Sequence, residues 1–269
     1  MAACDWNGRR VCAAALAALM VSWACAPTVS DKDRANARLH YDIAVASLNR
    51  GDERGALREL LAAVELDPHF PVARNALGFV YHTLGKLDEA RVQYEEAVRL
   101  KPDFSEAYNN LGVLLIDLGR YDEAIAAFNV ALKDILYATP SLAEGNLGWA
   151  YYKKGDVDLA LRHLRNAVAA NPGFCRGYEW LARIALDRDR GDDAVASVKR
   201  FRKFCLDDPA VAADVSPHYV HAMEFYLGLG LLKQGDRDGA REAFAVCGDA
   251  KADGEFQSRC RDNLESLAR

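Results

Sequence analysis

Residues 71–104 read PVARNALGFVYHTLGKLDEARVQYEEAVRLKPDF, and this stretch decides the fold. Gly85 separates two amphipathic segments, and Pro102 closes the second. Small residues at positions 8, 20 and 27 of the stretch would let two helices approach closely, while large residues at positions 7, 11 and 24 would fill the space between them. These residues are Gly78, Ala90 and Ala97, and Leu77, Tyr81 and Tyr94. We therefore predict two antiparallel helices joined by a turn at Gly85.

The same pattern recurs along the chain with a period of 34 residues. The units are 37–70, 71–104, 105–140, 141–174, 175–208 and 221–254. Thr139-Pro140 lengthens the third unit, residues 209–220 separate the fifth from the sixth, and the fifth carries Asp189 where the others have Gly. Such insertions are expected in loops. The spacing matches the tetratricopeptide repeat (TPR).

A single helix pair cannot bury its apolar face alone, so the units should stack on one another. We predict an all-α protein, a right-handed superhelical solenoid of six TPR helix pairs with a concave inner wall. Residues 255–269 should form a capping helix, because Phe256, Cys260, Leu264 and Leu267 share one helical stripe.

The composition argues against several classes of partner. The chain has a formal net charge of -5, with 51% apolar and 27% charged residues. Its mildly acidic surface has no run of Lys or Arg. Nucleic acid and anionic lipid would both need a basic surface. We expect neither nucleic-acid binding nor electrostatic docking on lipid headgroups.

Catalytic motifs are missing from the sequence. Gly228-Leu229-Gly230 begins like a dinucleotide fingerprint, but Lys233 occupies the position of its third glycine. His218 and His221 stand three residues apart without a carboxylate or Cys at ligand spacing. We therefore predict a protein that is not an enzyme, with no cofactor, no metal and no small-molecule substrate.

The N-terminus is typical of an export signal. Arg9-Arg10 precede the apolar run from Val11 to Trp23, which would make only about 20 Å of helix and is too short to span a bilayer. Residues 1–24 are thus a predicted signal peptide, with an N-terminal capping helix as the alternative. Ser22-Trp23-Ala24-Cys25 resembles a bacterial lipobox, which implies lipidation of Cys25 and a tether over residues 25–36. Ser22 replaces the usual Leu, so cleavage without lipidation is the alternative.

Four cysteines remain after Cys25, and an even number in an exported chain suggests disulfides. Cys175 begins the first helix of its unit and Cys205 ends the second, so antiparallel helices would bring them together. Cys247 lies late in one predicted helix and Cys260 early in the next. We predict the pairs Cys175–Cys205 and Cys247–Cys260, with four buried thiols as the alternative.

The concave wall is the predicted binding surface. Asparagines that can bond a peptide backbone, with aromatic residues beside them, suit an extended or helical peptide. An alternative is that Asn110 and Asn146 only serve the helix interface. The candidate groove residues are Asn75, Phe79, Asn109, Asn110, Val113, Trp149, Tyr152, Glu179 and Arg183.

One stretch is more specific than the repeats. Leu136-Tyr137-Ala138-Thr139-Pro140, followed by residues 146–152 (NLGWAYY), resembles the junction of the third and fourth repeats in TPR lipoproteins that act as pilotins of type IV pilus secretins, the PilF/PilW and Tgl type. Phe174-Cys175 with a later Cys205 is similar to that family as well.

This resemblance implies a lipid-anchored protein on the periplasmic face of the outer membrane. Its partner would be the secretin subunit of the type IV pilus, which it would help to localise and assemble into multimers. Ala26 after the candidate lipidated Cys25 resembles the outer-membrane sorting signal. The alternative is a periplasmic TPR lipoprotein that serves as an adaptor for cell-wall enzymes or another envelope complex.

Overall fold

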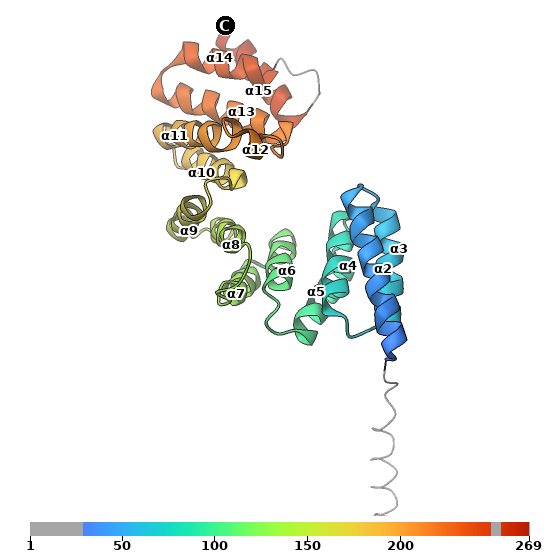
Figure 1. The fold of residues 1–269 in the computed structure, drawn as a ribbon. Helices are drawn as coiled ribbons and strands as arrows, with labels where there is room; N and C mark the ends of the chain where they lie inside the picture. Colours follow the sequence, from blue (N-terminus) through green and yellow to red (C-terminus); the bar gives the residue numbers. More distant parts are fainter. Residues whose placement is uncertain (1–28, 249–253, 269) are drawn as a thin grey trace, which may run out of the picture. The chain divides into compact units, whose positions relative to one another are not determined.

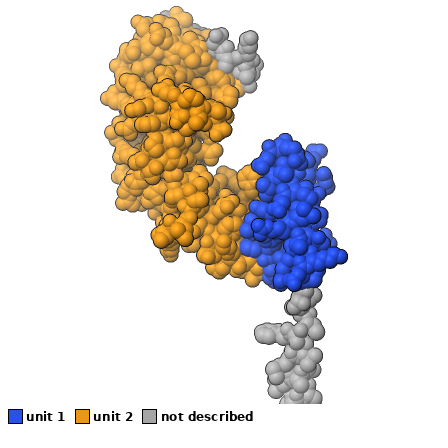
Figure 2. Space-filling view, in the orientation of Figure 1, with its two compact units in different colours: residues 1–73 blue, residues 74–269 orange. Residues whose placement is uncertain are grey.

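The structure, a computed structural model, describes residues 29–248 and 254–268. The chain divides into two compact units between Ala73 and Arg74 (Figure 2). Every regular element in the described ranges is a helix. None of these helices is both long enough and apolar enough to cross a membrane. The predicted signal peptide and Cys25 lie outside the described residues.

The first unit contains α2 (Asp31–Asn49) and α3 (Glu53–Leu66), which pack against each other (Figure 1). Helix α2 begins where Ser30 Oγ accepts the backbone N–H of Asp33 at 3.1 Å. Acidic residues in the first turn also suit the positive end of the helix dipole. This start corrects the expected tether, because residues 31–36 are helical.

The second unit begins within α4 (Pro71–Thr83) and continues as a series of helix pairs (Figure 1). The remaining elements are α5 (Leu87–Leu100), α6 (Ser105–Asp117), α7 (Tyr121–Ala131), α8 (Pro140–Lys154), α9 (Val157–Ala170), α10 (Cys175–Asp187), α11 (Gly191–Phe201), the π-helix η1 (Arg202–Leu206), α12 (Pro209–Ala212), α13 (Pro217–Gln234), α14 (Arg237–Gly248) and α15 (Glu255–Ala268).

Contacts between these helices follow the repeat. The two helices of a pair touch, as in α6 with α7 and α8 with α9, and the first helices of successive pairs also touch, as in α8 with α10. Helix α15 contacts α13 and α14 and buries Phe256, Cys260 and Leu267. The predicted all-helical array of TPR-like pairs with a final capping helix is therefore confirmed.

The turn inside each pair uses a left-handed residue. Glycine fills this position with a positive φ in five pairs, for example Gly85 at 72° and Gly119 at 73°. A residue without Cβ adopts this conformation at little cost. In the fifth pair Asp189 takes the same conformation at a φ of 59°, so the departure from the repeat pattern changes the residue but not the turn.

Close packing explains the small residue at position 8. A Cβ added to Gly112 would lie 2.5 Å from Phe128, and one added to Gly78 would lie 2.7 Å from Tyr94. Both aromatic residues stand at position 24 of their units and are buried, at 0% and 1% exposure. The small and large residues of the pattern thus meet across these pairs, as the sequence indicated.

Buried residues of the second unit form two hydrophobic clusters. One joins α5, α6, α7 and α8 around Tyr94, Leu114 and Phe128. The other joins α9, α10, α11, α13, α14 and α15 around Tyr178 and Phe244. Trp149 and Tyr151 of α8 pack against both clusters, so the apolar interior continues through the fourth pair.

The segment after α11 differs most from the expected pattern. It widens into η1, and residues 209–220 contain α12 and the first residues of α13 rather than only a loop. The reason is local capping: Asp208 Oδ1 accepts the N–H of Ala210 at 3.0 Å, and Pro217 follows Ser216 at the start of α13.

Two disulfides lie in this half of the chain. Cys175 at the start of α10 is joined to Cys205 in η1, with 5.9 Å between the Cα atoms. Cys247 of α14 is joined to Cys260 of α15, with a Cα separation of 6.0 Å. These are the two pairs that the antiparallel geometry suggested.

Candidate partner-binding groove

The asparagines proposed for the groove bond one another across repeats. Asn110 Nδ2 donates to Asn75 Oδ1 at 3.0 Å, and Asn146 Nδ2 donates to Asn109 Oδ1 at 3.0 Å. Asn75 also donates to Glu106 Oε1 at 3.2 Å. Since Asn75 and Asn109 are only 5% and 3% exposed, they serve the helix interface. Asn75 and Asn109 were expected to contact a ligand, and their burial corrects that assignment. The alternative raised for Asn110 and Asn146, that they only serve the helix interface, applies to Asn75 and Asn109 as well.

The two apolar candidates of the earlier repeats behave differently from each other. Phe79 of α4 is 46% exposed, so its ring is available at the surface. Val113 of α6 is half-buried and packs against the cluster around Phe128. Among the described residues, no aromatic ring stacks on Phe79.

The candidates of the fourth and fifth repeats converge. Trp149 of α8 lies 5.0 Å from the ring of Tyr152, and the guanidinium of Arg183 on α10 lies 5.4 Å from the Trp149 ring centroid. The hydroxyl of Tyr152 donates to a carboxylate oxygen of Asp187. Helical spacing on α8 and α10 places these side chains on facing sides of two first helices, which is why they meet.

Beside Arg183 the surface sinks into a cavity of about 340 Å³. Glu179 and Arg183 of α10 line one side, His218 and Tyr226 of α13 another, and Phe256 of the capping helix a third. The rings of His218 and Phe256 are 5.2 Å apart. We call this cavity, together with the adjoining Trp149, Tyr152 and Trp180, the aromatic groove.

Burial raises the pKa of three side chains in the groove. It raises the pKa of the Glu179 carboxyl, although the nearby His218, Arg176 and Arg183 oppose the shift. Burial and then the charge of Glu179 raise the pKa of Tyr226 to about 12. Burial, followed by the hydrogen bond to Asp187, raises the pKa of Tyr152. Both phenols therefore keep their protons at neutral pH, and that of Tyr152 donates to Asp187.

Sequence reasoning missed several residues of the groove. Trp180 stacks on Trp149 with the ring centroids 5.0 Å apart and the planes 10° from parallel. Trp180 and Tyr226 stand at position 6 of their units, the position that Asn110 occupies in the third, so the repeat offered a signal for both. Phe256 and Arg259 come from the capping helix, which lies outside the repeat units, so no repeat position could predict them.

A second exposed apolar surface lies outside the groove. Ile135 and Leu136, between α7 and α8, are 95% and 85% exposed. The Leu136 N–H donates to Asp134 Oδ1 at 2.8 Å, and Ser105 Oγ donates to Asp134 Oδ2 at 2.9 Å. These bonds hold the loop in place while it presents two large aliphatic side chains to solvent.

The groove has the chemistry of a peptide site. It offers aromatic faces for apolar side chains, and guanidinium and carboxylate groups for backbone C=O and N–H groups. A scaffold of helix pairs that presents such a groove defines a class, the helical-repeat binding proteins. The tetratricopeptide repeat model matches residues 41–103, 76–141 and 146–205, which is more than half of the chain. The chain belongs to the tetratricopeptide repeat family, whose members are typically scaffolds and not enzymes.

Solved structures share the fold over most of the chain. PilW, described as a widely conserved type IV pilus biogenesis factor, is 24% identical with a TM-score of 0.72, and the match covers 83% of this chain and 97% of PilW. PilF of Pseudomonas aeruginosa is 18% identical with a TM-score of 0.70, covering 87% and 100% of the two chains.

A third similar structure is YrrB, described as a TPR protein with an unusual peptide-binding site. It is 18% identical with a TM-score of 0.50, and the match covers 76% of this chain and 97% of YrrB. No curated protein matches the sequence. The chain is thus a protein-binding TPR scaffold that resembles type IV pilus biogenesis factors in fold.

Proposed function

We propose that this protein assists the localisation and multimer assembly of the type IV pilus secretin. The observation that carries the proposal is the match to PilW and PilF along nearly their whole length, at TM-scores of 0.72 and 0.70. The third-to-fourth repeat junction, which carries the sequence resemblance to secretin pilotins, includes the exposed Leu136. The aromatic groove supplies a surface suited to a segment of a secretin subunit.

The proposal includes an outer-membrane location. Acyl chains on Cys25 would hold the helix pairs at the periplasmic face, and two or more acyl chains give stable anchoring. The disulfides Cys175–Cys205 and Cys247–Cys260 support an exported protein, because such bonds persist in oxidising compartments. The groove would hold a secretin segment near the membrane and shield its apolar or edge-strand surface until neighbouring subunits pair with it.

The test is a blot of the pilus secretin from cells lacking this protein, run without boiling so that multimers survive. We expect the multimer to disappear while secretin monomer remains. Wild-type protein should restore the multimer, and Trp149→Ala should fail to restore it. Because Trp149 also packs against both hydrophobic clusters, circular dichroism of this variant must match that of wild type for the loss to be assigned to binding. Arg237→Ala, an exposed change outside the groove, is the matched control and should restore the multimer fully.

Anchoring is tested separately by Cys25→Ser. This variant should fold but assemble few multimers, and normal ring assembly by it would remove the anchor from the proposal. An unchanged multimer in cells without the protein would contradict the secretin role itself. Recovery of murein hydrolases with the tagged protein would then favour the cell-wall adaptor.

A further inference from the structure

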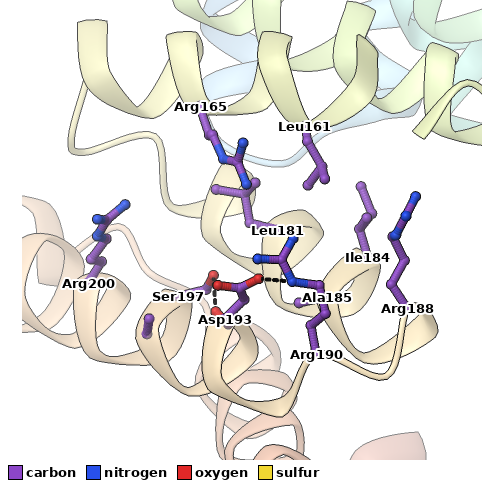
Figure 3. A pocket seen from close by; sticks show the side chains of 11 residues that line it. Leu161, Arg165, Leu181, Ile184, Ala185, Arg188, Arg190, Asp193, Ser197 and Arg200 are labelled. Carbon is purple, nitrogen blue, oxygen red and sulfur yellow. Dashed lines mark hydrogen bonds and ion pairs between the residues drawn. The ribbon is translucent and has the colours of Figure 1, made fainter. Parts of the chain in front are cut away.

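Four arginines surround a small cavity on the other side of α10 from the aromatic groove. The cavity has a volume of about 220 Å³ and lies where α9, α10 and α11 meet (Figure 3). Arg165 of α9, Arg188 at the end of α10, Arg190 of the turn and Arg200 of α11 line it. We call this site the arginine pocket.

Helix geometry separates the two sites. Successive residues of an α-helix are turned by about 100°, so residues 181, 184, 185 and 188 of α10 lie roughly opposite residues 179, 183, 186 and 187. The first set lines the arginine pocket and the second lines the aromatic groove. A ligand in one site therefore does not occupy the other.

The charges of the pocket are unbalanced. Its one acidic residue, Asp193, is paired with Arg190 at 2.5 Å and also accepts the Ser197 hydroxyl through its backbone oxygen at 2.8 Å. Arg188 lies 3.9 Å from Asp158, a pair that is largely exposed. Arg165 and Arg200 form no ion pair with any residue in the described ranges. Two exposed guanidinium groups are thus left for an anion, in a chain of net charge -5.

The repeat does not require these arginines. Arg165 stands at position 25 of the fourth unit and Arg200 at position 26 of the fifth. The corresponding residues in the other units are Leu61, Glu95, Asn129, Lys199 and Ala245, and Ala62, Glu96, Val130, Asn166 and Val246. Only where the fourth unit meets the fifth does a basic residue at position 25 of one unit combine with a basic residue at position 26 of the next. Helix packing alone therefore does not explain the two arginines.

The floor of the pocket is apolar. Leu161, Leu181, Ile184 and Ala185 line it between the arginines, and Figure 3 shows Leu161 reaching from its helix toward the floor. A free phosphate or a headgroup would gain nothing from such a floor, whereas a volume of about 220 Å³ accommodates an apolar side chain of the size of Leu or Phe. Planar guanidinium groups bind carboxylates through two parallel hydrogen bonds.

We propose that the arginine pocket binds a protein segment in which one large apolar side chain is flanked by Asp or Glu. The apolar side chain enters the floor, and Arg165 and Arg200 bind the flanking carboxylates. This site is separate from the groove proposed for secretin assembly. The proposal does not depend on which protein is the partner. The scaffold then has two separate contacts for protein segments, one on each side of α10.

The test uses a peptide labelled at its N-terminus, fluorescein-Asp-Glu-Phe-Glu-Asp-amide, and fluorescence anisotropy with the whole folded chain. We expect saturable binding with a Kd on the order of 100 μM at low salt that weakens as salt is added. The double change Arg165→Glu and Arg200→Glu should weaken binding at least about tenfold and should favour the corresponding Lys-Lys-Phe-Lys-Lys peptide. Arg237→Glu, an exposed arginine in another repeat, should change the Kd less than about twofold.

Two further arms separate the possible ligands. Replacing the peptide's Phe by Ser should weaken binding, because the floor is then unfilled. Vesicles of phosphatidylglycerol should not sediment with the protein in an Arg165- and Arg200-dependent way. The proposal is overturned if the Phe and Ser peptides bind alike, if the double variant binds like wild type, or if only the vesicles bind. Circular dichroism of each variant should match that of wild type, since all three arginines are exposed.

Discussion

The second and third helix pairs differ from the fourth to sixth pairs in chemistry although they share one frame. In the earlier pairs the polar residues of the first helices bond one another, as Asn110 does with Asn75, and no disulfide joins the described helices. In the later pairs the corresponding surface carries Trp149, Trp180 and Arg183, and two disulfides join helices of these pairs and the capping helix. The repeat therefore sets the backbone, and positions outside its pattern decide where a ligand can bind.

The largest expected effect is the loss of stability when a disulfide of the later pairs is removed. Changing Cys175 and Cys205 together to Ala should lower the free energy of unfolding by about 3.5 kcal/mol, since the bond closes a loop with a sequence separation of 30. For Cys247 and Cys260, with a separation of 13, the loss should be about 3 kcal/mol. Amide hydrogen exchange should accelerate in residues 175–268 and stay unchanged in residues 74–131. Equal acceleration in both regions would show that they unfold as one unit.

A smaller effect is expected from the asparagine pair of the third and fourth repeats. Asn109→Ala removes the acceptor of the buried Asn146 amide and should cost about 1–3 kcal/mol in unfolding free energy. Changing both Asn109 and Asn146 to Leu removes donor and acceptor together, so the loss should be smaller than for Asn109→Ala. Urea unfolding of the two variants compares them. A larger loss in the double variant would mean that packing, not the hydrogen bond, dominates this interface.

The smallest effect concerns the aromatic groove. Burial raises the pKa of Glu179, so the folded state disfavours its ionised form and loses stability as the pH rises from the usual carboxyl range through the raised folded pKa. Glu179→Gln should therefore raise Tm by a few degrees at neutral pH and by less at pH 4. Calorimetry at the two pH values measures this difference. A Tm gain that is the same at both would contradict the burial argument.

The sequence was sufficient for the frame. Position 8 glycines and position 24 aromatics predicted close helix pairs, and Gly112 against Phe128 is such a contact. The two disulfide pairs of the structure followed from the antiparallel direction of paired helices. Asp189 shows the limit of residue matching, because it adopts the left-handed turn although it is not a glycine.

The candidate groove was predicted only in part. Trp149, Tyr152, Glu179 and Arg183 meet in the groove, but Asn75 and Asn109 point into the interface. The helical period predicts which side of a first helix a residue occupies. The groove and the interface with the neighbouring first helix both lie on that side, so the period does not distinguish a groove residue from an interface residue. The contributions of Phe256 and Arg259 depend on how the capping helix folds back, which no repeat position encodes.

The segment between the fifth and sixth pairs also has a consequence for engineering of the array. A π-helical turn such as η1 accommodates extra length inside a helix, and α12 takes up more before α13 resumes the repeat. The residues added here thus leave the repeat pattern intact on either side. The exposed residues Ala213 and Asp214 mark a permissive position, where an epitope tag or fluorescent reporter could be inserted while the flanking helix pairs keep their register.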